Sequence, residues 1–519
     1  MRACALFADS RTLLSSFDCP VHIPGSIRSG ISAFRVRIQK ITAGRESCTM
    51  IHRFIAGNIQ SSSFFLLVLL LVGCIAPAFA QTVQFDQDAT PTIIFGDGND
   101  NGAFTTDRRK DIEIAIRGKL RFNDSGLPEN TFNSNGDGSY SFDAIVAPTQ
   151  TSPTPEWAFD WSVNSDYTDS AGRNLDELVY EIGLDGDPGV GTDFLVFDPI
   201  TPSNEAPFFD HAIGNNTTGN GDGTVATDGT SYQTLLADNN VAQNSWRYDF
   251  FNGDGTALEN FDPTVNGRYA VYIQAMDPTT NEVLARSYIQ ILAGDAPKPA
   301  TVYVDADFAG ANLGDTVQFT MPGGGTVEAE FGVDAFAELQ NAVDAVEENG
   351  TVLMGSDITE DLVKVDKAIT LDGNGFTLSS TSDNFGVSIQ SLDATIENLI
   401  VDGAGTFGIH QSPGSDNLVI RGTTVQNGGG SGFAMNCSNN ILLQNISAFD
   451  NGGNGVSITN CTDVVIDGIT TSGNQFTTFS AGIGIFSSET TCPPEGTDGV
   501  EITDSANISE PVPVYTQVS

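Results

Sequence analysis

The sequence has few basic residues, few histidines and few cysteines, and each shortage excludes a class of function. The 66 aspartates and glutamates outnumber the 22 lysines and arginines, so the formal net charge is −44 at pH 7. A surface of this charge repels nucleic acid and anionic membranes, but it suits cation binding or simple solvation in salty surroundings. The four histidines and seven cysteines form none of the standard spacings of a zinc site. Nucleic acid and zinc are therefore not expected as partners.

Long hydrophobic runs are also scarce, and the run at residues 64–72 is too short to predict a membrane span. A short basic segment precedes it, and the small residues Ala78 and Ala80 follow it. This order is typical of a secretory signal peptide that is cleaved after Ala80. The segment ending at Cys74 also resembles a bacterial lipobox, in which Cys74 would be lipidated. Secretion and lipid anchoring at the cell surface both stay open.

The residues before this signal do not fit an exported protein. Residues 1–49 are basic and show no clear period, whereas an export signal normally begins near the start of a chain. We therefore interpret Met50 as the initiator, residues 50–80 as the signal peptide, and residues 1–49 as mistranslated upstream sequence or a disordered leader. The mature chain is expected to be a bacterial exported protein without a transmembrane domain.

Residues 81–298 alternate apolar and polar side chains with a period of two. The clearest runs are DIEIAIRGKLRF, EWAFDWSV, ELVYEIGL and GRYAVYIQA, separated by loops of Asp, Asn, Gly and Pro. Such runs predict half-buried strands, and the absence of long helical patterns between them predicts an antiparallel β-sandwich. The segment NTFNSNGDGSYSF and the runs around it resemble a module of secreted proteins from environmental bacteria. A boundary at GDAPKPATV separates this domain from residues 299–519.

The second domain contains an internal repeat. Glycines that open short apolar runs recur every 22 to 27 residues, at Gly386, Gly408, Gly432, Gly455 and Gly482. Apolar residues follow each glycine at the same places, namely Val387, Ile409, Phe433, Val456 and Ile483, and later Ile396, Ile420, Leu443 and Ile466. A period near 22 with short strands fits the coils of a parallel β-helix, in which stacked coils share one core. The all-β fold is thus a sandwich followed by a solenoid.

On these columns, residues 301–519 resemble the right-handed parallel β-helix of the pectin-lyase-like superfamily. The segment 334–348 carries an apolar stripe at helical spacing, made of Phe336, Leu339, Val343 and Val346. In that superfamily an amphipathic helix covers the open end of the core, and the resemblance implies the same here. The chain ends at EPVPVYTQVS without an evident polar cap, which is compatible with a fragment that lacks further coils.

The resemblance implies that substrate would lie along one outer sheet. Lyases of this superfamily use a basic residue with calcium, and hydrolases use clustered aspartates. The basic residues in the aligned coils are His410 and Arg421, with Asp402 and Asp450 in nearby turns, and these four form a candidate saccharide site. The alternative is an ordinary surface ion pair between Glu397 and Arg421 with turn carboxylates around it. The motifs of polygalacturonases and of alginate epimerases are not found.

Calcium is the one cofactor that the sequence suggests. The stretch DGNDNG places Asp97, Asn99 and Asn101 at the spacing of a calcium loop, but the twelfth position is Arg108 instead of a glutamate. A second loop, NSNGDG at 133–138, has the same composition. Both loops also read as β-turns, so the two interpretations stay open.

Cys437 and Cys461 occupy similar places in consecutive repeats, in MNCSNN and TNCTDV. Adjacent coils are about 4.8 Å apart, so a disulfide between them is feasible, and a buried thiol pair is the alternative. Two functions remain: an exported β-helix that binds or processes a polysaccharide or cell-surface glycan, or a non-catalytic adhesin or scaffold. An enzyme of this kind would be a polysaccharide lyase, hydrolase or epimerase.

Overall fold

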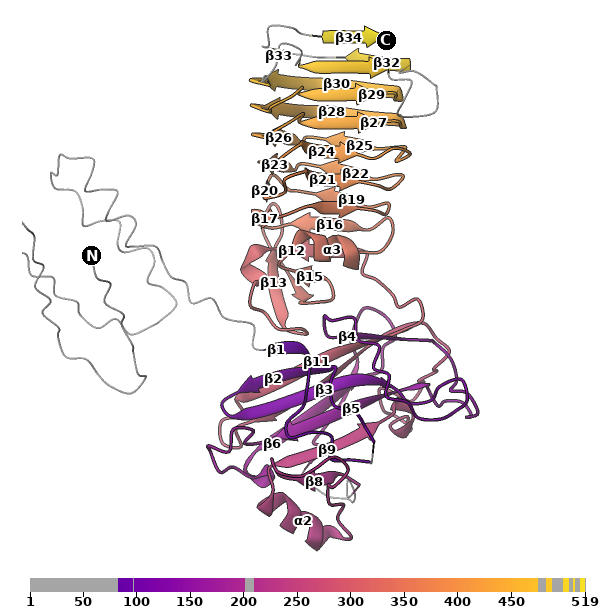
Figure 1. The fold of residues 1–519 in the computed structure, drawn as a ribbon, viewed down its shortest axis with the longest axis vertical. Helices are drawn as coiled ribbons and strands as arrows, with labels where there is room; N and C mark the ends of the chain where they lie inside the picture. Colours follow the sequence, from indigo (N-terminus) through magenta and orange to yellow (C-terminus); the bar gives the residue numbers. More distant parts are fainter. Residues whose placement is uncertain are drawn as a thin grey trace, which may run out of the picture. The chain divides into compact units, whose positions relative to one another are not determined.

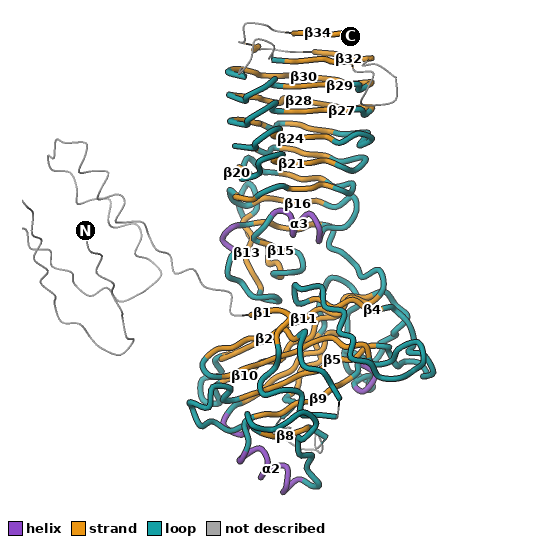
Figure 2. Tube along the Cα trace, viewed as in Figure 1, coloured by secondary structure: helices purple, strands orange, loops and turns teal. Residues whose placement is uncertain are grey.

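The computed structural model describes residues 83–96, 98–200, 210–474, 482–487, 498–503, 507–508 and 514–518 (Figure 1). Antiparallel sheets occupy the part up to residue 293, and a parallel solenoid begins at residue 301. Figure 2 shows how short strands and loops alternate around each turn of the solenoid. The mostly-β class predicted from the sequence is confirmed. The exact domain boundary at residue 298 stays a prediction.

Two sheets form the N-terminal part. The six-stranded sheet has the order β1-β2-β3-β5-β9-β8, and the five-stranded sheet has the order β4-β11-β10-β6-β7. Their bounds are β1 Val83–Gln87, β2 Phe104–Arg109, β3 Ile112–Leu120, β4 Ser139–Phe142, β5 Trp157–Asn164, β6 Val179–Asp185, β7 Phe194–Phe197, β8 Ala212–Gly214, β9 Val241–Trp246, β10 Gly267–Met276 and β11 Val283–Ala293. Neighbouring strands are antiparallel except β4 and β11, which run parallel. The helix α2 (Gly229–Asp238), which the pattern did not predict, is capped at its start by Asp228.

The expected alternation holds on the core side of these strands. Trp157, Phe159 and Trp161 of β5 point into one buried apolar cluster, together with isoleucines of β3. The opposite side of β3 and β5 is also buried, contrary to the prediction of half-buried strands. The reason is that residues before β2 fold back over it and pair with its polar side chains, as where Thr90 bonds Glu113. Buried polar groups then keep their hydrogen bonds.

The solenoid has three faces. The first face contains β12 (Thr301–Val304), β16 (Thr351–Met354), β19 (Thr370–Asp372), β22 (Thr395–Glu397), β25 (Val419–Arg421), the start of β28 (Asn439–Phe449), the start of β30 (Thr462–Ser472) and β32 (Asp498–Thr503). The second face contains β17 (Ile358–Glu360), β20 (Thr377–Ser380), β23 (Ile400–Asp402), β26 (Thr424–Gln426), the ends of β28 and β30, and β33 (Asn507–Ile508). The third face contains β18 (Val363–Val365), β21 (Phe385–Ile389), β24 (Phe407–Gln411), β27 (Phe433–Asn436), β29 (Val456–Thr459), β31 (Ile483–Ser487) and β34 (Val514–Val518).

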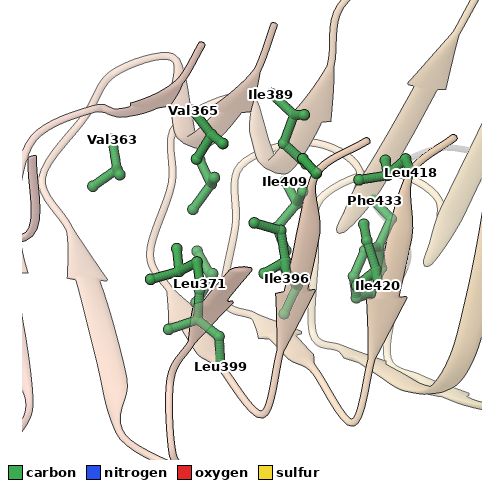
Figure 3. Close-up of a cluster of buried hydrophobic side chains, with 14 of the residues drawn as sticks. Val363, Val365, Leu371, Ile389, Ile396, Leu399, Ile409, Leu418, Ile420 and Phe433 are labelled. Atoms are coloured by element: carbon green, nitrogen blue, oxygen red, sulfur yellow. The ribbon is translucent and has the colours of Figure 1, made fainter. Parts of the chain in front are cut away.

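The pairing register confirms the repeat read from the sequence. Ile420 pairs with Ile396 on one side and with Leu443 on the other, and all three are fully buried. On the third face, Ile409 pairs with Val387 and with Phe433 in the same way. Figure 3 shows Ile396, Ile420, Ile409 and Phe433 gathered between the faces of the coils. The core is therefore continuous from coil to coil, as a stack that no single coil could bury alone.

One end of this core is covered by the predicted helix. The helix α3 spans Leu339–Ala345, which is shorter than the predicted 334–348, and Phe336 belongs instead to the short strand β15 (Ala335–Phe336). Leu339 and Val343 are fully buried and belong to the same apolar cluster as the coils. The short strands β13 (Thr316–Thr320) and β14 (Thr326–Glu330) form a separate antiparallel hairpin.

Two asparagine arrangements shape the corners. Between the first and second faces, left-handed backbone occurs at Asn398, Gly422, Asn445 and Gly468, one in each coil. Asparagine and glycine alternate there, and a side chain added at Gly422 would come 2.8 Å from the Asn398 amide oxygen. After the second face, the buried Asn451 accepts a bond from the Gly428 amide (3.0 Å) and donates to Asn474 (2.9 Å). These bonds connect three coils.

Candidate functional site

The four candidate saccharide residues lie on different sides of the solenoid. His410 lies on β24 in the third face, Arg421 ends β25 in the first face, and Asp402 ends β23 in the second face. Asp450 follows β28 at the corner behind the second face, where its backbone is left-handed. The structure therefore does not bring the four together as one cluster.

Arg421 bonds to the preceding coil and Asp402 to the following one, in the way typical of surface ladders. Arg421 pairs with Glu397, and its side chain is about half exposed. Asp402 accepts bonds from the amides of Gln426 (3.3 Å) and Asn427 (2.8 Å), its neighbours one coil further on. Such pairs between exposed groups stabilise little. Their geometry agrees with the alternative of a surface ion pair and ordinary turn carboxylates.

His410 has a different environment, which the sequence did not reveal. Its imidazole is stacked on the ring of Phe385, with centroids 4.1 Å apart and planes 7° from parallel. The ring of Phe407 lies 5.7 Å from His410 and 5.8 Å from Phe385, again nearly parallel. We call these three residues the ring stack. It lies on the outer side of the third face, and no ring of the stack belongs to the apolar core.

The backbone explains why these phenylalanines point outward. Each precedes a glycine that faces the core: a side chain at Gly386 would come 2.6 Å from Val401, and one at Gly408 would come 2.0 Å from Val425. Only a residue without a Cβ fits there, so the preceding residue turns away from the core. The dipeptide Phe-Gly in two successive repeats was the signal that could have located the ring stack.

The hydrogen bonding and charge of His410 are also unusual. Its Nδ1 atom is buried and has no hydrogen-bond partner among the described residues. Burial lowers the pKa of His410, so the ring is neutral near pH 7. Along the outer column it lies between Ser388 and Ala434, and Lys364 precedes Ser388 in the same column. An unsatisfied buried polar atom in a native structure calls for an explanation, and function is one of them.

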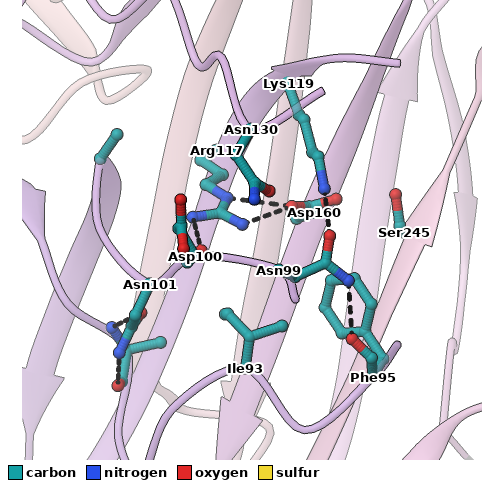
Figure 4. A network of polar contacts seen from close by, with 12 residues as sticks. Ile93, Phe95, Asn99, Asp100, Asn101, Arg117, Lys119, Asn130, Asp160 and Ser245 are labelled. Atoms are coloured by element: carbon teal, nitrogen blue, oxygen red, sulfur yellow. Dashed lines mark hydrogen bonds and ion pairs between the residues drawn. The ribbon is translucent and has the colours of Figure 1, made fainter. Parts of the chain in front are cut away.

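Among the described residues, the first candidate calcium loop is bonded to a basic side chain of the protein itself (Figure 4). The Lys119 ammonium donates to the side-chain oxygen of Asn99. The Asn101 side-chain oxygen accepts the backbone amides of Ala89 (2.9 Å) and Gly102 (3.0 Å). Asp97 lies outside the described residues. Repulsion by Lys119 disfavours a calcium ion at Asn99, and no group of metal-binding side chains occurs among the described residues.

Arg117 completes this arrangement beneath the loop. Its guanidinium donates to backbone oxygens of Asp100 (3.0 Å) and Gly102 (2.7 Å), which a metal would otherwise use. It also donates twice to the buried Asp160, at 2.9 and 2.8 Å. Both side chains are fully buried, so the pair requires these bonds to offset the cost of desolvation. In the second loop, Asp137 accepts from Ser139, as a β-turn does. The calcium prediction itself stays untested.

Neither alternative for Cys437 and Cys461, a disulfide between them or a buried thiol pair, agrees with the structure. Cys461 is a free, buried thiol, whereas Cys437 takes part in a disulfide whose partner lies outside the described residues. The register explains the error, because Asn436 pairs with Thr459 and Asn439 pairs with Thr462. Cys437 therefore lies opposite Asn460, one residue away from Cys461. The two cysteines are 24 residues apart, and the coils repeat here every 23.

The geometry of stacked coils agrees with the comparison with family models. Residues 363–509 match the right handed beta helix region. This match confirms the fold resemblance for the solenoid and says nothing about an activity. A search of curated proteins gave no match.

Solved structures show a distant likeness. The catalytic domain of a GH87 alpha-1,3-glucanase variant in complex with nigerose has 10% identity and a TM-score of 0.20, with 67% of this chain and 69% of that chain covered. Another variant of that domain, in complex with tetrasaccharides, has 11% identity and a TM-score of 0.19, with 70% and 81% covered. These values do not support an inference about activity.

The residues of the predicted export signals, Cys74, Ala78 and Ala80, lie outside the described part. Within the described part, no helix is both long and apolar enough to cross a membrane. Both possible maturation routes remain predictions.

Proposed function

We propose that this protein binds a polysaccharide along the third face of the solenoid, and that the ring stack of Phe385, Phe407 and His410 forms the centre of the binding surface. The ring stack is the observation that carries the proposal. Aromatic side chains on an outer sheet face leave apolar surface in contact with water, and large exposed apolar groups mark interaction sites. A sugar ring offers a matching apolar side made of C–H groups.

The polar neighbours of the ring stack fit the other side of a sugar. Sugar hydroxyls both donate and accept, and the neutral imidazole of His410 can do the same. Ser388 precedes His410 in the outer column, and the exposed Lys364 precedes Ser388. The smaller residues Ala434 and Ser457 continue the column beyond His410. Ser388 and Ala434 are themselves buried, so a chain of sugars laid along this face would meet the rings and the Lys364 ammonium.

Binding is proposed without cleavage. Glycosidic hydrolysis requires two carboxyl groups placed on either side of one bond, and the candidate carboxylates Asp402 and Asp450 lie away from the ring stack on another side of the coils. This dispersal favours the binding form of the first candidate function over the processing form. The second candidate, a non-catalytic adhesin or structural scaffold in which the solenoid is only a spacer, stays the alternative. We further propose that the chain works outside the cell, with Gln81 or a lipidated Cys74 as its first residue. N-terminal mass analysis of exported protein distinguishes the two routes.

The experiment that tests the proposal measures binding of the purified chain to a panel of neutral glucans, polyuronates and amino-sugar polymers. Phe385→Ala and Phe407→Ala should each weaken binding about five- to tenfold, as expected when an aromatic contact is removed. Phe449→Ala is the matched control, because Phe449 is also a partly buried outward phenylalanine but lies on the second face. The proposal fails if no polysaccharide binds, or if the control weakens binding as much as the ring-stack variants.

A further inference from the structure

The N-terminal part contains a second, independent site, a cleft of about 890 Å³. This size lies within the range of roughly 300–1,000 Å³ that is typical of ligand pockets. Its walls come from the end of β3 and the loop after it, from the end of β4 and the residues after it, and from residues that directly precede β5, precede β10 and follow β11. The cleft is therefore built from segments that are far apart in the sequence.

The side chains around the cleft are acidic. Five carboxylates line it: Asp124, Glu129, Asp143, Glu156 and Asp295. Three side-chain amides and the apolar side chains of Phe122, Phe142 and Ile145 complete the wall, and no basic side chain lines it among the described residues. Two arginines pack over Phe122 without lining the cleft: Arg121, and Arg247, which forms two bonds to Asp249 at 2.9 and 3.0 Å. The side chains that line the cleft itself are thus negatively charged.

Glu156 lies at the base of the cleft. It is 8% exposed, whereas the other four carboxylates are exposed around the rim. Its Oε1 accepts the backbone amide of Asp143 at 2.8 Å, and Oε2 has no hydrogen-bond partner among the described residues. Its backbone oxygen accepts the amides of Arg121 and Phe122, which fixes the strand at this point. Because Oε2 is not itself buried, it is open to the solvent of the cleft, where a ligand cation can pair with it.

We propose that this cleft binds an oligosaccharide that carries free amino groups, with one ammonium on Glu156. A charge-assisted bond from the ammonium to Oε2 would satisfy the open carboxylate oxygen. The rim carboxylates Asp124 and Asp143 would attract the cationic chain from solution. The side-chain amides of Asn133 and Asn266 would bond hydroxyls, and the exposed Ile145 would contact the apolar side of the sugar.

Other ligand classes fit this cleft less well. A polyuronate carries the same sign of charge as the rim and would be repelled. A basic peptide satisfies the carboxylates but leaves the hydroxyl-binding amides with fewer partners. The described residues form no group of metal-ligating side chains here. Burial raises the pKa of the Glu156 carboxyl, and the charges of Asp143 and Asp124 add to the rise, so a neighbouring ammonium would relieve this repulsion.

The test measures the affinity of the purified chain for a glucosamine hexamer, for its fully N-acetylated counterpart and for hexalysine at one low salt concentration. We expect the glucosamine hexamer to bind at least tenfold more tightly than either of the others. Glu156→Gln keeps the shape and the Asp143 bond but removes the charge, and it should weaken glucosamine binding at least tenfold. Asp254→Asn is the control, because Asp254 is an exposed carboxylate that does not line the cleft.

Four results would overturn the proposal: no binding of the glucosamine hexamer, equal binding of the acetylated hexamer, equal or tighter binding of hexalysine, or equal losses in Glu156→Gln and Asp254→Asn. Unchanged thermal unfolding of Glu156→Gln establishes that a loss is local. Phe449→Ala, which lies in neither proposed site, should leave glucosamine binding unchanged. Binding of the glucosamine hexamer is scored on Glu156→Gln and binding of neutral glucans on Phe385→Ala, so a failure of this site and a failure of the solenoid site are distinguishable.

Discussion

Replacing Ile420 with aspartate should unfold the solenoid while the N-terminal sheets stay folded. Ile420 is fully buried between Ile396 and Leu443 in the stack of coils. The next residue, Arg421, points outward and is about half exposed beside Glu397. Consecutive residues of one strand thus provide a buried site and an exposed site for the same substitution.

The expected magnitudes differ by several kilocalories per mole. Loss of a buried isoleucine side chain removes about 1.5–3 kcal/mol of apolar stabilisation. A carboxyl group without hydrogen-bond partners adds a cost of about 1–3 kcal/mol even when it is protonated. The sum, about 2.5–6 kcal/mol, is a large share of the roughly 5–15 kcal/mol that stabilise a domain. Arg421→Asp removes an exposed pair and should cost about 0–1 kcal/mol. Ile420→Val should cost about 0.5–1.5 kcal/mol.

The tryptophans make the assay selective. The chain has three, Trp157, Trp161 and Trp246, and all lie in strands of the N-terminal six-stranded sheet. Tryptophan fluorescence in urea therefore reports on that sheet, whereas far-ultraviolet circular dichroism reports on both parts. Ile420→Asp should lose strand signal in dichroism with native fluorescence. Equal behaviour of Ile420→Asp and Arg421→Asp would refute the coil register.

Three further predictions concern the corners, pH and calcium. Asn451→Ala leaves the Gly428 amide and the Val425 carbonyl without their partner. The free energy of unfolding in urea should therefore fall by about 2–3 kcal/mol. A fall below roughly 0.5 kcal/mol, about the error of such a measurement, would contradict this prediction. Burial raises the pKa of Asp185 to about 6, above its usual value near 3.8, so its carboxyl must ionise at a cost in the folded state. The wild-type stability relative to Asp185→Asn should therefore fall as the pH rises from about 4 to 6, and a difference independent of pH would argue against this. Because the chain is so acidic, millimolar calcium should raise the melting temperature more than sodium at equal ionic strength, and identical melting curves would leave only screening.

The solenoid could be predicted because its core follows a period that the sequence displays directly. Once the repeat length is known, the sequence alone predicts that Ile396, Ile420 and Leu443 stack on one another. The structure confirms this pairing residue by residue. The cysteine pairing failed because the same reasoning was applied at a corner, where a shift of one residue separates Cys437 from Cys461. Periodicity fixes strands better than the turns between them.

The sites were harder to predict, for physical reasons. Phe385 and Phe407 turn outward because the glycines after them face the core without room for a Cβ, which strict alternation does not anticipate. The burial of Glu156 depends on segments more than a hundred residues apart, so no local pattern reveals it. Asn99 and Asn101 have the composition of a calcium loop, but a distant lysine and the backbone already bond their oxygens.

At the corner between the first and second faces, asparagine and glycine alternate from coil to coil. This order limits how the solenoid can gain or lose coils. Asn398 and Asn445 occupy every second coil, and the amide of Asn398 lies across the position of Gly422, where a side chain would have to displace it. Duplication or loss of a single coil would place like residues next to each other and break this order. Duplication or loss of two coils would preserve it. The solenoid should therefore have grown, and should be most readily engineered, in steps of two coils.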